Sequence, residues 1–187
     1  MKSMKVALAS GLLVLGFGLF SKAQAAGNPD TMTISVTPSV TYAVSIASVT
    51  GGAGYQFGTV ALAASTISTA AIVVTNTGTI SEYFAMAVSN SAPDNWSAAA
   101  AGTAAANAFG LIGEFSATQP AIAAFVGGDA LVNAIPGTSD TLYGQSSTKT
   151  NVAGTKNLWL KLNMPTTLSV GTGGAQTMVV SINGQAS

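Results

Sequence analysis

The sequence contains no cysteine, no histidine and no arginine, and charged residues make up 6% of its 187 positions. An ordinary globular protein carries roughly a quarter. The lack of Cys excludes a disulfide framework, a thiolate metal site and a thiol nucleophile. The lack of His removes the commonest general base and metal ligand, and with them a Ser-His-Asp triad. Without Arg there is no bidentate phosphate clamp and no basic nucleic-acid footprint. The composition therefore argues against most enzymes and against a nucleic-acid partner.

Acidic residues carry the remaining options for chemistry, and none of them lies in a recognisable motif. Glu82 begins one expected strand and Glu114 lies within another. Paired carboxylates can cleave glycosides, but solvated strand positions are the commoner use of such residues. Gly127-Gly128-Asp129 lacks the dense acidic ligands of a calcium loop. We expect no catalytic residue, no metal site and no cofactor, and we predict that the protein is not an enzyme.

The first 25 residues have the features of a secretory signal peptide. Lys2 and Lys5 precede an apolar run over residues 6–20, and Ala23-Gln24-Ala25 provides the small residues that a signal peptidase reads before Ala26. The run is shorter than the about 20 apolar residues that a membrane span needs. We therefore expect a mature chain of residues 26–187 with no membrane span, secreted from a bacterial cell to the extracellular space or cell surface.

Signal cleavage leaves three Lys against six acidic residues, a net charge of −3. More than half of the whole chain is Ala, Gly, Ser or Thr. Soluble monomers usually rely on surface charge to keep copies apart. Two interpretations stay open: uncharged polar side chains keep the protein soluble, or self-association is tolerated and is its purpose.

Apolar residues recur at a spacing of two along most of the mature chain, which is typical of half-buried strands. Leu158, Leu160 and Leu162 are expected to face inward, with Trp159 on the other face. We expect a loop over residues 97–108, with a short helix as the alternative, because alanines favour helix but nothing large is available to bury. The expected strands cover residues 31–37, 40–46, 56–62, 67–75, 82–89, 109–115, 121–126, 157–163 and 176–183.

No helix long enough to connect parallel strands separates the expected strands, so βαβ units and a parallel sheet are not expected. The prediction is an all-β protein: one antiparallel Greek-key, immunoglobulin-like β-sandwich over residues 26–187. A closed barrel is the alternative architecture.

Three short segments resemble a known group of proteins. They are Phe57-Gly58-Thr59-Val60, then residues 72–78 with an Asn-Thr-Gly turn, then Glu82-Tyr83-Phe84-Ala85-Met86. This succession is similar to secreted bacterial immunoglobulin-like domains, including the TasA and camelysin type of biofilm-fibre subunit. The later Leu158–Leu162 strand, followed by Pro165 and a final strand, suits the same plan. The resemblance implies an extracellular structural role with polymerisation by strand exchange, and no catalytic residues.

The first functional hypothesis is therefore a secreted subunit that assembles with copies of itself into a filament, sheath or surface layer. Residues 26–37 are the candidate exchangeable arm, in which Met32, Ile34 and Val36 would fill pockets of the next copy. The alternative is a cell-surface adhesin or carbohydrate-binding module, with Trp96 and Trp159 as a platform for surface glycans. Buried core anchors are the commoner use of such rings.

Overall fold

The computed structural model describes residues 32–47, 54–136, 140–169 and 174–186. The chain divides into two compact units, Met1–Pro38 and Ser39–Ser187, and each is described by itself. In the first unit, residues 32–38 form neither helix nor strand. The expected signal peptide, residues 1–25, lies outside the described residues.

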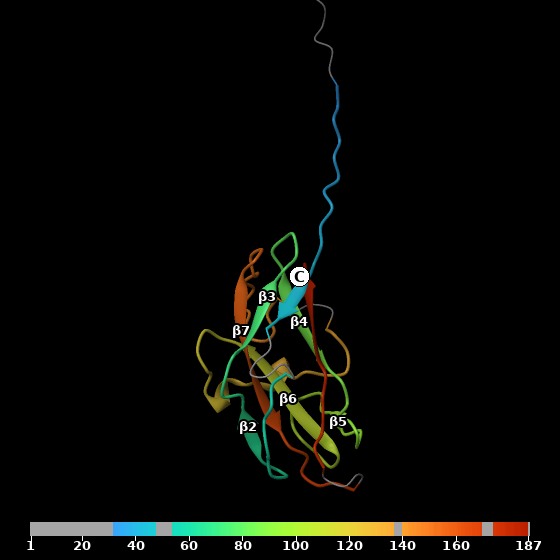
Figure 1. Cartoon of the computed structure of the whole chain (residues 1–187), viewed down its shortest axis with the longest axis vertical. Coiled ribbons are helices and arrows are strands. Elements are labelled where there is room, and N and C mark those ends of the chain that lie inside the picture. The colour runs from blue at the N-terminus through green and yellow to red at the C-terminus, as the bar shows by residue number, and fades with distance from the viewer. Residues whose placement is uncertain (1–31, 48–53, 137–139, 170–173, 187) are drawn as a thin grey trace, which may run out of the picture. The chain divides into compact units, whose positions relative to one another are not determined.

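The second unit is built almost entirely of β-structure (Figure 1). Among the described residues, the only helical segments are two 3-10 turns, η1 (Ile122–Ala124) and η2 (Gly127–Asp129). The all-β class is therefore confirmed. The strands are β1 (Val44–Ile46), β2 (Ser65–Ile67), β3 (Ile72–Asn76), β4 (Tyr83–Val88), β5 (Ser97–Ala98), β6 (Ala108–Phe115), β7 (Thr155–Asn163) and β8 (Val180–Gln185).

The longest strand, β7, lies in the middle of the larger sheet, whose order is β1-β3-β7-β6-β5 with β2 also paired to β7 (Figure 1). β3 and β2 follow one another along one edge of β7, and β6 runs along its other edge. These pairs are all antiparallel. β5 runs parallel to β6, so the sheet is curled and mixed rather than purely antiparallel.

Ser68 explains why the single strand expected over residues 67–75 is split into β2 and β3. Its amide donates to the Leu160 carbonyl at 2.7 Å, and its Oγ accepts from the Leu160 amide at 3.0 Å. The hydroxyl thus replaces the backbone carbonyl that a regular strand residue would offer. Ser68 is completely buried, so both polar groups of Leu160 are satisfied although residues 68–71 leave the sheet.

β4 and β8 form a separate two-stranded antiparallel sheet, in which Met86 lies opposite Ile182. Phe84, Met86 and Val88 of β4 are buried in the same apolar cluster as the leucines of β7. The rings of Phe84 and Phe115 on β6 lie 5.5 Å apart. The main core therefore lies between the two sheets.

The predicted alternation along β7 is confirmed. Leu158, Leu160 and Leu162 join the main core, whereas Trp159 packs with Ile112 and Phe125 in a second cluster. A period of two thus assigns each β7 side chain to one face of the sheet.

The Asn76-Thr77-Gly78 turn also forms where expected. Asn76 is fully buried; its Oδ1 accepts from the Gly78 amide, and its Nδ2 donates to the carbonyls of Ile80 and Thr150, each at 2.8 Å. A Cβ on Gly78 would collide with the Thr41 carbonyl, so glycine is required where the chain entering β1 approaches the turn.

Other expected strands differ from the structure. Residues 121–126 contain η1 instead, because Phe125 finds a buried position while Ile122 and Val126 stay exposed. Residues 56–62 pair with no strand in the described chain, and Gly58 has a positive φ of 70° that interrupts extended backbone. Residues 32–37 likewise have no partner strand among the described residues. β8 begins at Val180 rather than at residue 176.

Candidate functional site

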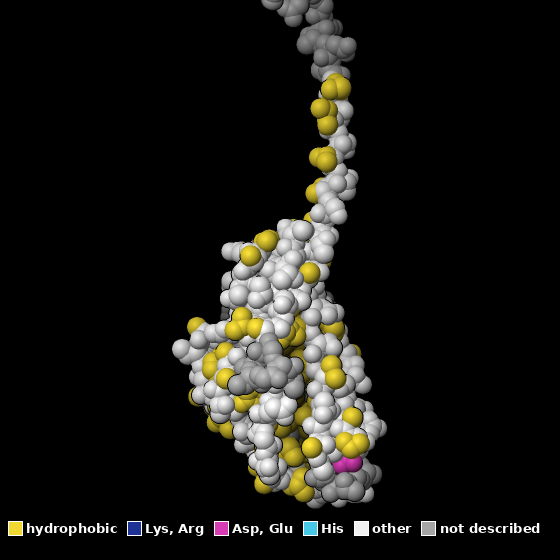
Figure 2. All heavy atoms as spheres, in the orientation of Figure 1, with side chains coloured by type: hydrophobic (Ala, Val, Ile, Leu, Met, Phe, Trp, Pro, Cys, Tyr) yellow, Lys and Arg dark blue, Asp and Glu magenta, His cyan; other side chains and the backbone are white. Residues whose placement is uncertain are grey.

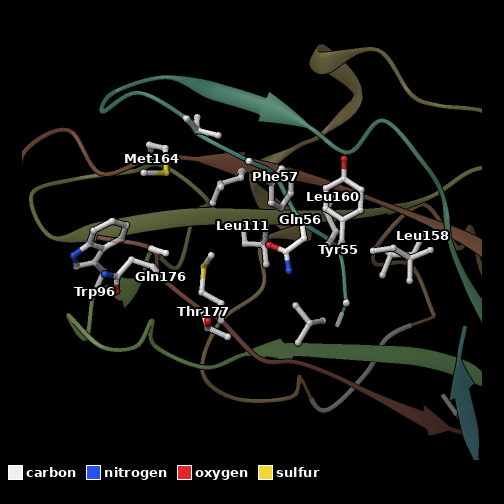
Figure 3. A pocket seen from close by; sticks show the side chains of 18 of the residues that line it. Tyr55, Gln56, Phe57, Trp96, Leu111, Leu158, Leu160, Met164, Gln176 and Thr177 are labelled. Carbon is white, nitrogen blue, oxygen red and sulfur yellow. The ribbon is translucent and has the colours of Figure 1, made fainter. Parts of the chain in front are cut away.

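A groove of about 850 Å³ opens into the main core. Figure 2 shows apolar side chains gathered along a furrow on this face. One wall is the inner face of the larger sheet, with Leu111 of β6 and the three inward leucines of β7 (Figure 3). Met178, Val180 and Ile182 line the groove from the β8 side. Two rows of side chains at a spacing of two therefore line a space that neither sheet fills.

No charged side chain is among the described residues that line this groove. Its polar side chains are uncharged: Gln56, Thr59, Gln176, Thr177 and the Tyr55 hydroxyl. Figure 3 places Trp96 beside Gln176 at one end and Leu158 toward the other. The groove thus suits an uncharged, largely apolar occupant, because burying an unpaired charge here would be costly.

Backbone geometry shows which edge of β8 faces away from β4. The Phe84 amide and carbonyl bond to the Gln145 side chain, and the Val88 amide bonds to the Val132 carbonyl, so these β4 groups point away from β8. In an antiparallel pair, residues opposite such positions also point their backbone groups outward. Val180 lies opposite Val88, and Ile182 lies opposite Met86, two residues from Phe84. The amides and carbonyls of Val180 and Ile182 therefore face the open edge of β8, where no other strand of the described chain pairs.

Residues 54–60, which we call the crossing segment, run across the groove (Figure 3). Tyr55 and Phe57 are half-buried against the core, and their rings meet edge to face at 4.8 Å. The Tyr55 hydroxyl accepts from the Thr69 amide at 2.7 Å and lies 3.2 Å from Thr69 Oγ1. The sequence pattern predicts a strand over residues 56–62 and does not predict this role. The sequence signal for it is the pair of glycines that flank Tyr55 and Phe57, Gly54 and Gly58, and both have a positive φ in the structure.

The proposed assembly residues are exposed. The exposed fractions of Met32, Ile34 and Val36 are 82%, 79% and 85%. Three large apolar residues in succession at a spacing of two are left without a buried environment. Their alternation is the one that a strand pairing on a half-buried face would use.

The two tryptophans lie in different places, and neither is exposed. Trp96 is 3% exposed and lines the groove, and its Nε1 has no hydrogen-bond partner among the described residues. Trp159 is 8% exposed and belongs to the second cluster on the other face of β7. The structure therefore does not bring these two rings together on one surface.

Three carboxyl groups are held in environments that favour protonation. Burial raises the pKa of Glu82, against a smaller lowering by the Ala43 amide, which donates to Oε2 at 3.2 Å. Burial also raises the pKa of Glu114, and repulsion from Asp129 raises it further. The pKa of Asp129 is raised by burial despite the Tyr143 amide that donates to Oδ1 at 2.6 Å. No cluster of three or more potential metal ligands occurs within the described residues.

Comparison with protein-family models, with curated proteins and with solved structures finds no match for this chain. Within the described ranges, no helix has both the length and the apolar character needed to traverse a bilayer.

Proposed function

We propose that the protein is a secreted bacterial structural subunit that assembles into an extracellular filament, sheath or surface layer by exchanging a β-strand between copies. One observation carries the proposal: the chain combines an unfilled apolar groove beside an open strand edge with an exposed segment of alternating apolar residues. The groove's occupant is residues 32–36 of a second copy. The resemblance to TasA and camelysin type subunits agrees with this assignment.

The segment and the groove match in spacing and in chemistry. Met32, Ile34 and Val36 would enter the groove, while the alternate residues Thr33 and Ser35 face out. The backbone of the segment would bond to the outward amides and carbonyls of β8, as in other strand-addition complexes. Neither partner brings a charge into the contact, so no charged group has to be desolvated.

The free energy gained by burying the three side chains is similar in size to the cost of bringing two copies together. Burying three such side chains contributes about 5–9 kcal/mol in total, at about 1.5–3 kcal/mol each. Association costs about 4–15 kcal/mol in lost translational and rotational freedom. The side chains alone therefore roughly balance the cost, and edge hydrogen bonds of about 0.5–1.5 kcal/mol each decide the outcome. Losing one apolar side chain should raise the concentration needed for assembly steeply.

The contact is head-to-tail, because each copy offers one segment and one groove. Such heterologous contacts do not close on themselves unless the rotation happens to do so, and they generate open filaments. As part of the same proposal, we assign the two facing sheets to an immunoglobulin-like, Greek-key β-sandwich in which one strand position is left for the neighbour.

The test compares mature protein with two matched triple variants by negative-stain electron microscopy and sedimentation. Changing Met32, Ile34 and Val36 to Ser removes the groove-facing side chains, and we expect only soluble single copies. Changing Thr33, Ser35 and Thr37 to Ala alters the opposite face of the same segment, and we expect filaments to remain. Deleting residues 26–37 should match the first variant.

Unchanged polymers after the first triple substitution or after the deletion would overturn strand exchange. A glycan-array signal from strictly single-copy protein would instead favour the adhesin or carbohydrate-binding alternative. Trp96 and Trp159, the two rings expected to form the glycan platform, are both buried and do not offer an exposed surface to that alternative.

A further inference from the structure

The crossing segment has the side-chain pattern of a strand without the backbone pairing of one. Tyr55 and Phe57 face the core while Gln56 between them is exposed. Within the described residues, no backbone–backbone hydrogen bond connects residues 54–60 to a strand. The segment is therefore held in the groove by side-chain contacts, chiefly those of the two rings, whereas a paired strand would also be held by backbone hydrogen bonds along its edge.

The attachments of these rings are weak. Tyr55 is anchored by its hydroxyl to Thr69, and this contact is exposed to solvent, where a hydrogen bond competes with water. Phe57 touches Tyr55 edge to face and has no polar anchor. A volume of about 850 Å³ remains open beside them, so the rings fill the groove incompletely.

The backbone on either side is suited to a change of direction. Gly54 and Gly58 have φ values of +83° and +70°, and a Cβ built on either would meet nothing within 4 Å. These glycines are therefore not required by close packing. They are required by backbone angles that other residues adopt only with strain.

From these observations we propose that Tyr55 and Phe57 form a removable plug, which occupies part of the groove in the free subunit and is displaced by residues 32–36 of the incoming copy. The inference rests on the proposed function, because it assigns regulation to the same groove. Plugged and open subunits are two states, and a donor segment that binds the open state alone shifts the population toward it. The plug slows assembly until subunit concentration is high enough to compete with it.

The first test is the assembly kinetics of the full mature chain, followed by light scattering. Tyr55→Phe keeps the ring and removes the hydroxyl anchor, so we expect the lag to shorten about fivefold, the factor that corresponds to one ordinary hydrogen bond. Gly58→Ala strains the plugged backbone and should act in the same direction. Tyr42→Phe, at an exposed position outside the groove, should leave the lag unchanged.

The second test is hydroxyl-radical footprinting of free and assembled protein, read by mass spectrometry at single residues. Oxidation of Tyr55 and Phe57 should rise several-fold on assembly, while the fully buried Phe109 stays protected. Filaments that form with an unchanged lag in Tyr55→Phe and unchanged oxidation of the two rings would overturn the plug and leave strand exchange standing. Absence of any assembly by the mature chain would overturn both.

Discussion

The side chain of Gln145 binds both backbone groups of Phe84: Oε1 accepts from the amide and Nε2 donates to the carbonyl, each at 2.8 Å. These are the two bonds that a neighbouring strand would make, so Gln145 closes the outer edge of β4 in place of a strand. The Tyr143 hydroxyl, which donates to the Met86 carbonyl at 3.1 Å, continues the closure. The small sheet therefore has one edge closed by side chains and one edge, on β8, that faces the groove.

We predict that Gln145→Leu destabilises the fold strongly. Leucine fills a similar volume but leaves the Phe84 amide and carbonyl buried without partners. Two such groups should lower the free energy of unfolding by about 2–6 kcal/mol, at about 1–3 kcal/mol each. Urea unfolding of the mature protein measures the change.

The matched comparison is Gln119→Ala, which removes a single bond from Gln119 Nε2 to the Ser68 carbonyl at 2.7 Å. Losing this partly buried hydrogen bond should lower the free energy of unfolding by about 1 kcal/mol. Equal losses in the two variants would contradict the role of Gln145 as a substitute strand.

Stability should fall as the pH rises, and Glu82 should contribute to that trend. Its carboxyl is completely buried, and Oε1 has no partner among the described residues. Because burial raises its pKa in the folded protein above the ordinary value of 4.5, the folded state binds the proton more tightly than the unfolded state does. That contribution is fully present below pH 4.5 and is lost as the pH rises through the folded pKa.

Glu82→Gln should flatten this pH dependence and raise stability at neutral pH, as measured by urea unfolding across pH 4 to 8. Glu114 and Asp129 have raised pKa values too, so part of the slope should remain in the variant. A Glu82→Gln slope identical to that of the parent protein would contradict the assignment.

The parts of the fold that sequence predicts are those with a local signal. Alternation assigns Leu158 and Trp159 to opposite faces of β7, and the Asn76-Thr77-Gly78 turn follows from residues that tolerate tight backbone. Each of these signals is contained within a few neighbouring residues, and tertiary packing reinforces it.

The parts that sequence does not predict depend on partners far along the chain. Ser68 ends β2 through Leu160, 92 residues away, and Gln145 reaches Phe84 across 61 residues. Residues 32–37 alternate as true strands do, and residues 56–62 have a composition that suits a short strand, but pairing needs a free edge, and sequence does not say which edges are free. The groove follows from that missing pairing, so the sequence predicts the exposed segment of the candidate site but not the groove.

A charge placed on the side of β8 that lines the groove should block assembly without unfolding the subunit. Val180→Lys places an ammonium group in a groove that has no charged partner among its described lining residues, and Lys at a free edge opposes strand addition. Ser181→Lys adds the same charge one residue along, on the exposed face that points away from the groove. We expect filaments from Ser181→Lys and none from Val180→Lys, with the two melting temperatures differing by only a few degrees. Filaments from both variants would exclude the β8 edge as the acceptor, because an incoming strand could not tolerate a buried, unpaired lysine there.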